Sequence, residues 1–312
     1  MGDLMHALPA LTEAKEHIEN ISFDWVVDKN FSSVPSWHPV VDNIITTDHR
    51  NWKKQLFSRN SRASLRDAVS QINKSNYDLV LDMQNNLKSA FISYLSKHDV
   101  VGMDAKSARE YPAHLAYSKK IYVDKELHAI ERQKKLLGKA LGYDYTKNYV
   151  NYGASFNSFI KPNINLPDKY FVLVQNASWV TKQWPIKKWQ QLIQVLEDKG
   201  IDMLLPSGNL EELDRAKEIC SISNKAHAID LMPLNEIAYI IKNADFCICS
   251  DTGLAHLSAL TGTPSITLYG PTKISLIGTN GLNQKHLIGD NEDINQITVS
   301  DVISELDRNY IS

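Results

Sequence analysis

The chain has 312 residues, of which 43% are hydrophobic and 22% are charged, a composition typical of a soluble globular protein. Its length allows one large or two ordinary domains, and its formal net charge of −2 at pH 7 argues against a general nucleic-acid binder. No apolar run approaches the roughly 20 residues of a transmembrane helix and no signal peptide is visible, so we expect a cytoplasmic protein.

The first half is predicted to open with a helix. Leu4, Leu8, Leu11 and Ile18 recur at helical spacing, so this helix runs to about residue 18, and Pro9 either kinks it or marks an early turn. Strands are then predicted at residues 21–27, 44–45, 77–84 and 100–103, a loop at 31–38, and helices at 87–95 and 128–141, the last ended by Gly142.

Gly2 and Asp3 stand at the start of the first helix. A carboxylate at this point is a good N-cap, and the helix dipole favours its negative charge. The small Gly2 would also let a substrate approach the backbone. From these residues alone, a plain N-cap is the favoured interpretation of Asp3.

Residues 50–66 form a basic stretch that contains no acidic residue. Arg59, Arg62 and Arg66 lie three and four positions apart, so a helix would place them on one face. A solvated helix face is the ordinary explanation of such a pattern. The alternative is an anion-binding surface, for which lipid phosphates or sugar acids fit better than nucleic acid.

The second half follows a polar connection at residues 143–165, which has weak periodicity and contains Gly153 and Pro162. Beyond it, the alternation of strands and helices predicts a parallel sheet. We therefore expect two Rossmann-like α/β domains, residues 1–157 and 158–312. The predicted strands of the second are 170–175, 201–206, 226–229, 245–250 and one that starts at 265 and ends in the turn at 270–271. The predicted helices are 189–199, 210–222, 234–243 and 297–306, besides the short helix after the turn at 251–253.

Cys220, Cys247 and Cys249 are the only cysteines, and so sparse and odd a count suggests a reducing compartment. Cys247 and Cys249 lie two apart on a predicted strand and therefore share one face. A metal pair would need a further Cys or His cluster, which the sequence lacks. Buried apolar cysteines are the favoured interpretation.

The stretch 245–284 is the most informative for function, because a buried strand leads into a tight polar turn and a short helix. Asp251 and Thr252 are good helix caps, and Gly253 would let a ligand approach the backbone. A helix start attracts phosphate, and ligands of open α/β sheets bind at the carboxyl ends of strands. An ordinary capped helix is equally compatible with this spacing, and His256 could assist phosphate binding or pack in the core.

Residues 251–256 (Asp-Thr-Gly-Leu-Ala-His) and 269–272 (Tyr-Gly-Pro-Thr) resemble the ADP-heptose:lipopolysaccharide heptosyltransferases, glycosyltransferase family 9. The match continues through residues 1–3, 23–27, 35–38 and 182–185, and so covers nearly the whole chain. It implies a GT-B fold, in which residues 1–157 bind the acceptor and residues 158–312 the nucleotide sugar across a central cleft. It also implies an inverting enzyme that moves L-glycero-D-manno-heptose from ADP-heptose to Kdo of lipid A at the inner face of the inner membrane. No metal or other cofactor is implied.

The resemblance also implies site residues. Asp3 would be the general base and Lys182 the cation beside the leaving diphosphate, although a lone lysine is ordinarily a surface residue. Glu212 would bind the ribose and Met232 would flank the adenine, whereas the residues alone favour a solvated carboxylate and a core methionine. The other implied donor residues are Ser178, Asp251, Thr252, Gly253 and His256, and the implied acceptor residues are Arg59, Arg62, Arg66 and Arg109.

The sequence departs from the family pattern at two points. Ala177 stands where the family has a hydroxyl residue, which places one phosphate contact in doubt. A hydrophobic strand that precedes Met-Gly-Asp in the family is missing, so we expect either a different start or a shortened first sheet without a central strand. A related transferase with another acceptor and an inactive, binding-only homologue therefore remain alternatives.

Overall fold

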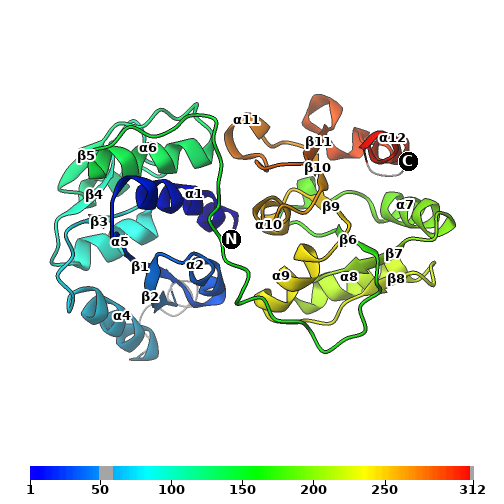
Figure 1. The fold of residues 1–312 in the computed structure, drawn as a ribbon, viewed down its shortest axis with the longest axis horizontal. Helices are drawn as coiled ribbons and strands as arrows, with labels where there is room; N and C mark the ends of the chain where they lie inside the picture. Colours follow the sequence, from blue (N-terminus) through cyan, green and yellow to red (C-terminus); the bar gives the residue numbers. More distant parts are fainter. Residues whose placement is uncertain (49–58, 310–312) are drawn as a thin grey trace. The chain divides into compact units, whose positions relative to one another are not determined.

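The computed structural model describes residues 1–48 and 59–309. The chain divides into two compact units, the first made by residues 3–157 and the second by residues 158–312 (Figure 1). Parallel strands and helices form both units.

The first unit opens with α1 (Gly2–His17), which contains Pro9 without ending there. Met5, Leu8 and Leu11 are fully or almost fully buried on this helix. The prediction that Asp3 caps the helix was wrong. The N-cap is Met1, and Asp3 already lies in the first helical turn, where the dipole still favours a carboxylate.

The strands of the first unit form two separate parallel sheets in the described part of the chain. β1 (Phe23–Asp28) pairs with β2 (Val41–Thr47), and β3 (Val80–Leu81), β4 (Val100–Met103) and β5 (Lys119–Ile121) form the second sheet in that order. The helices expected at 87–95 and 128–141 are present as α5 (Leu87–Leu95) and α6 (Ala129–Leu141), and Gly142 ends α6 with a φ of 90°. The structure also has the helix α4 (Arg59–Ile72).

Several predictions for the first unit were wrong in extent. The expected strand at 77–84 is reduced to β3, because the chain turns immediately after Leu81. The expected loop at 31–38 contains the short helix α2 (Ser33–Ser36), after the 3-10 turn η1 (Lys29–Phe31). The polar strand β5 and the 3-10 turn η2 (Ala113–Ala116) were not predicted.

The second unit is built on a six-stranded parallel sheet with the order β11-β10-β9-β6-β7-β8. Its central strands are buried apolar runs, as expected for strands covered on both faces. The strands are β6 (Tyr170–Val174), β7 (Asp202–Leu205), β8 (Ala226–Ala228), β9 (Phe246–Ser250), β10 (Ser265–Tyr269) and β11 (Gln284–Ile288).

Helices cover both faces of this sheet (Figure 1). Trp189 and Leu192 of α7, Ile219 of α8 and Leu306 of α12 share one buried cluster with Phe171 and its neighbours in the sheet. α9 and α10 lie on the other face. The helices are α7 (Ile186–Asp198), α8 (Leu210–Cys220), α9 (Leu234–Lys242), α10 (Gly253–Thr261), α11 (Ile274–Ile277) and α12 (Val299–Asn309).

The strand order of the second unit reverses between β6 and β9. From β6 the chain adds β7 and β8 on one side, then returns to place β9, β10 and β11 on the other. In an open α/β sheet, a ligand-binding crevice lies outside the carboxyl ends of the strands at such a reversal. The residues that follow β6 and β9 therefore occupy the position where this fold binds ligands.

All three cysteines are free and buried, which confirms the apolar interpretation. Burial raises the pKa of the Cys220 thiol to about 12, so this group is a poor nucleophile. Within residues 1–48 and 59–309, no helix combines the length and the apolar character needed to cross a membrane.

Candidate functional site

A cluster of three polar side chains lies at the reversal point of the second sheet. Asp251 follows β9, and its Oδ2 accepts hydrogen bonds from Lys182 Nζ at 2.6 Å and from Thr272 Oγ1 at 2.5 Å. The Asp251 side chain is only 6% exposed, whereas that of Lys182 is 20% exposed. A buried carboxylate thus holds a partly accessible ammonium group at the carboxyl edge of the sheet.

Helix α10 begins beside this cluster. Thr252 is its N-cap, with Thr252 Oγ1 accepting a hydrogen bond from the Leu254 N–H at 3.2 Å, so the predicted cap is confirmed. Gly253 is the first helical residue. The free N–H groups of a first turn, with the dipole behind them, favour an anion. His256 is buried on the next turn.

The loop after β6 carries Lys182 to Asp251. Ser178 and Trp179 are exposed in this loop, and the 3-10 turn η3 (Val180–Lys182) follows them. Gln183 Nε2 donates to the Ala177 carbonyl at 2.8 Å and closes the loop. Lys182 Nζ also lies 5.7 Å from the centre of the Trp179 ring, within the range of a cation–π contact.

The Glu212 carboxylate orders the turn after β7. Glu212 Oε2 accepts from the Gly208 N–H at 2.9 Å, and Glu212 Oε1 accepts from Asn209 Nδ2 at 3.0 Å. Asn209 is the N-cap of α8 and accepts in return from the Glu212 N–H. Glu212 is therefore a capping residue rather than a merely solvated carboxylate, and its contact with a ribose stays a prediction.

Met232 lies in the loop between β8 and α9. It is half-buried and is not a member of the buried core of the second unit, so its interpretation as a core residue was wrong. The chain leaves the carboxyl end of β8 just before this loop. Met232 thus comes from the same edge of the sheet as Asp251 and Glu212.

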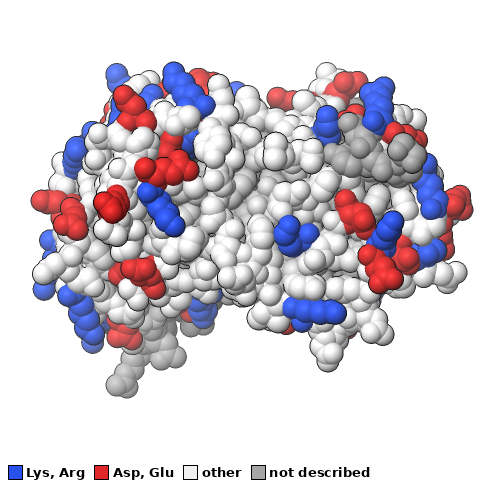
Figure 2. Space-filling view, viewed as in Figure 1, with Lys and Arg blue, Asp and Glu red and all other residues white. Residues whose placement is uncertain are grey.

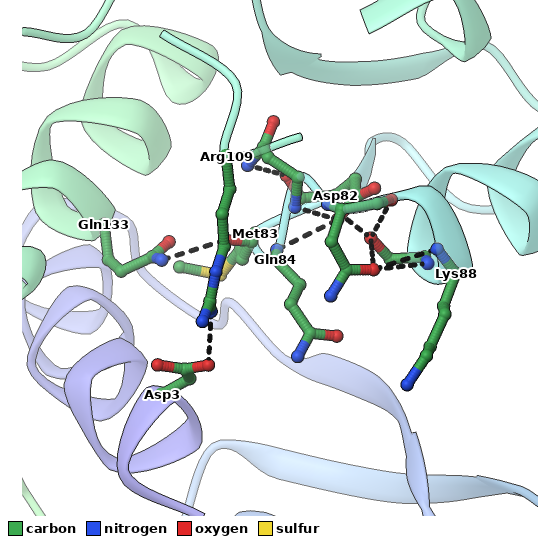
Figure 3. Close-up of polar contacts among 10 residues, drawn as sticks. Asp3, Asp82, Met83, Gln84, Lys88, Arg109 and Gln133 are labelled. Atoms are coloured by element: carbon green, nitrogen blue, oxygen red, sulfur yellow. Dashed lines mark hydrogen bonds and ion pairs between the residues drawn. The ribbon is translucent and has the colours of Figure 1, made fainter. Parts of the chain in front are cut away.

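In the first unit, Asp3 and Arg109 form an ion pair that the sequence did not predict. Arg109 Nη1 lies 2.6 Å from Asp3 Oδ2, and the two side chains are 57% and 49% exposed. Figure 3 shows Arg109 reaching across to Asp3. Burial opposes ionisation of Asp3, but the Arg109 guanidinium, helped by His6 and the chain N-terminus, outweighs it and lowers the pKa of that carboxyl below its ordinary value. Asp3 is therefore ionised at neutral pH.

The turn after β3 lies next to this ion pair in Figure 3 and is held by Asp82. Asp82 Oδ1 accepts from the Gln84 and Asn85 N–H groups at 2.9 Å, and Asp82 Oδ2 accepts from Tyr117 Oη at 2.7 Å. Burial raises the pKa of Asp82, against these hydrogen bonds. Asp82 thus stabilises the turn, whereas the side chains of Gln84 and Lys88 are exposed to solvent (Figure 3).

The predicted basic face is present in part. Arg62 and Arg66 are exposed on α4 and stand four residues apart, so they share one face. Arg59 is the first residue of α4, but its side chain and residues 50–58 lie outside the described residues. Figure 2 shows acidic and basic side chains interspersed over the visible face of both units.

The predicted site residues thus fall into two groups, each within one unit. Lys182, Asp251, Thr252 and Gly253 are brought together after β6 and β9, whereas Asp3 and Arg109 meet in the first unit. Sequence reasoning missed Thr272 as a partner of Asp251. The position of Thr272, just after the carboxyl end of the neighbouring strand β10, was the feature that could have identified it as a partner of Asp251.

Comparison with known proteins gives consistent results. The model of glycosyltransferase family 9 (heptosyltransferase) matches residues 65–303. Lipopolysaccharide heptosyltransferase 1 of Escherichia coli O18:K1:H7 is 36% identical over 313 aligned residues, which cover 99% of this chain and 95% of that protein.

Two solved structures are also similar over their length. E. coli heptosyltransferase WaaC with ADP matches with a TM-score of 0.91 at 35% identity, covering 99% of this chain and 96% of that one. The same enzyme with ADP-2-deoxy-2-fluoro heptose matches with a TM-score of 0.87 at 35% identity and the same coverage.

Proposed function

The chain belongs to glycosyltransferase family 9, the heptosyltransferases, with their GT-B fold of Rossmann-like α/β units, and we propose that it transfers heptose from ADP-heptose to a Kdo residue of lipid A. In this proposal the second unit binds the nucleotide sugar and the first unit binds the acceptor. Transfer would invert the anomeric centre, because the acceptor hydroxyl displaces ADP in line.

The observation that carries this proposal is the Lys182–Asp251 pair beside the start of α10. A nucleotide diphosphate gains negative charge as it leaves the sugar, so a transferase must neutralise it. The ammonium group and the first-turn N–H groups supply positive charge at one place. Solved structures of the 35% identical WaaC hold ADP and an ADP-heptose analogue, which supports the choice of donor.

Nucleotide binding tests the donor part of the proposal. Because ADP would bind only the folded protein, ADP should raise the melting temperature in a concentration-dependent way. UDP offers the same diphosphate and ribose but a different base, so it should stabilise the protein less. Equal shifts with ADP and UDP would count against an adenine-binding site near Met232.

On the acceptor side, we assign Asp3 as the general base. Its ionised carboxylate could take the proton of the acceptor hydroxyl while ADP departs. Arg109 holds that carboxylate at 2.6 Å and offers further N–H donors to an acidic sugar. Arg62 and Arg66 present two more cations to the carboxylates and phosphates of Kdo-lipid A.

Reversing both charges in Arg62→Glu/Arg66→Glu should raise the acceptor KM several-fold and leave the Kd of ADP nearly unchanged. Rising salt should weaken acceptor use by the wild-type protein in the same direction, since exposed charges are screened. Steady-state kinetics at two ionic strengths measure both effects. The matched control reverses the exposed Lys125 and Lys147 of the same unit. If the double reversal has the acceptor kinetics of the wild-type protein, Arg62 and Arg66 form only a solvated helix face and do not bind the acceptor.

We further propose that the first unit touches the cytoplasmic face of the inner membrane through exposed apolar side chains on α5, on η2 and just before η2. The two elements pack on each other through Ala90, Ala113 and Ala116, so their outer faces are continuous. A large exposed apolar patch marks an interaction surface, and the acceptor is itself a lipid. The patch consists of Leu87, Phe91, Tyr94, Tyr111 and Leu115.

Replacing Phe91 and Tyr94 together by serine should lower binding to anionic phospholipid vesicles several-fold, because burial of two aromatic rings would be lost. Vesicle flotation measures the bound fraction. The double variant Leu282→Ser/Ile288→Ser, which removes two exposed apolar side chains of the second unit, should bind as wild type does. If the Phe91/Tyr94 variant binds vesicles as strongly as the Leu282/Ile288 variant does, the proposed membrane contact is refuted.

A further inference from the structure

Asn176 and Ser207 are among the buried polar side chains of the second unit that lack a hydrogen-bond partner within the described residues. Both polar atoms of the Asn176 amide and the Ser207 hydroxyl are unpaired, although the two residues are only 7% and 6% exposed. A buried polar group without a partner has lost its hydrogen bonds to water without replacing them, so native proteins seldom keep one without a reason. Two such residues in one place indicate a missing partner.

Their position in the sheet identifies that place. β6 ends at Val174 and β7 ends at Leu205, so Asn176 and Ser207 each lie two residues beyond the carboxyl end of their strand. The two strands are neighbours, with Val172 paired to Leu204. The unpaired groups therefore emerge at the same edge of the sheet.

The same edge carries the two charged groups of the candidate donor site. β9 pairs with β6 on the side opposite β7, and Asp251, which forms the ion pair with Lys182, follows β9. Glu212 holds the turn at Gly208, the residue after Ser207. From β9 across β6 to β7, this edge thus presents the Lys182 ammonium group, then the Asn176 amide, then the Ser207 hydroxyl and the Glu212 carboxylate.

We propose that Asn176 and Ser207 hydrogen-bond the ribose of the bound nucleotide. This inference rests on the proposed function, because it assumes a nucleoside diphosphate at this edge. Adjacent strands lie about 4.8 Å apart, so the two strand spacings from β9 to β7 span about 10 Å, the scale of a phosphate joined to a ribose. A diphosphate only accepts hydrogen bonds, whereas ribose hydroxyls both donate and accept, as an amide and a hydroxyl also do.

A buried water molecule is the competing explanation, since such waters commonly satisfy buried polar groups. The two explanations differ in what removal of the amide does to the protein without nucleotide. If a structural water bonds Asn176, then Asn176→Ala loses those bonds and lowers the melting temperature. If the partner is the nucleotide, the unliganded variant loses no bond and melts at or above the wild-type temperature.

The test measures the Kd of ADP and of 2′-deoxy-ADP by calorimetry for the wild-type protein, Asn176→Ala and Ser207→Ala. Asn176→Ala should weaken ADP binding about tenfold, the scale of one hydrogen bond, and should discriminate less between the two nucleotides. Ser207→Ala should act in the same direction. The control Asn243→Ala removes the same amide at the amino edge of the sheet, where it is bonded to the Tyr239 carbonyl, and should leave ADP binding intact.

Each outcome decides a separate question. If the wild-type protein binds ADP and the Kd is unchanged in both Asn176→Ala and Ser207→Ala, this inference is overturned and the proposed function still stands. Failure of ADP to bind the wild-type protein would overturn the proposed function and this inference together.

Discussion

Asp3→Asn is expected to lower kcat by about 10²–10⁴-fold, the range typical of a lost general base. Asparagine keeps the size of the side chain but cannot take the proton of the acceptor hydroxyl. Because Asp3 belongs to the first unit, ADP affinity should stay close to wild type. The lost Arg109 contact joins two half-exposed side chains, so the change in stability should be small.

Single-turnover kinetics at saturating donor and acceptor measure this effect most cleanly, with ADP calorimetry on the same preparation. The control Asp67→Asn removes an exposed carboxylate from α4 of the same unit and should leave kcat unchanged. Since the pKa of Asp3 lies below its ordinary value, its carboxylate stays ionised as the pH rises from neutrality, and titration of Asp3 should not limit the rate there. A near-normal kcat in Asp3→Asn would refute the general-base assignment.

Lys182→Ala should be the second severe substitution, with kcat/KM for the donor reduced about 10²–10³-fold, the scale of one deleted charge-stabilising group. Two physical effects add. The leaving diphosphate loses its ammonium partner, and the buried Asp251 carboxylate is left without its cation beside an anionic ligand. Thr272 still donates to Asp251 and relieves only part of that cost.

Lys182→Arg separates the charge from the geometry, because it keeps a cation but changes the donor arrangement. It should retain more ADP stabilisation than Lys182→Ala in a thermal shift measurement. Lys187→Ala makes the same truncation at an exposed position of α7 and should behave as wild type. An ADP-induced shift in Lys182→Ala equal to that of wild type would contradict the donor site.

The second unit was the more predictable part of the fold. Its interior strands are apolar runs such as Phe246–Ser250, and its helices end at clear stop signals, so the alternating order could be read directly. Gly200 and Gly262 adopt positive φ angles just after helices, as a glycine stop requires. The strand β11 was missed because Gln284, Lys285 and His286 give an edge strand no apolar signal.

The first unit was harder to predict because side chains override the strand pattern. Residues 77–84 were predicted as one strand, yet the Asp82 carboxylate accepts from the N–H groups of Gln84 and Asn85. Asn85 also takes a φ of 52°, which turns the chain. No local pattern reveals a contact between residues 106 positions apart, so the Asp3–Arg109 pair had to come from the structure. The Lys182–Asp251 pair spans 69 positions and is equally invisible to spacing.

The measurement that tests this account most directly is transfer of heptose by the purified protein from ADP-heptose to Kdo-lipid A, followed by mass spectrometry of the lipid and by release of ADP. We expect one added heptose for each ADP released. A protein that binds ADP yet adds no heptose to this acceptor would contradict the account and would favour a binding-only homologue.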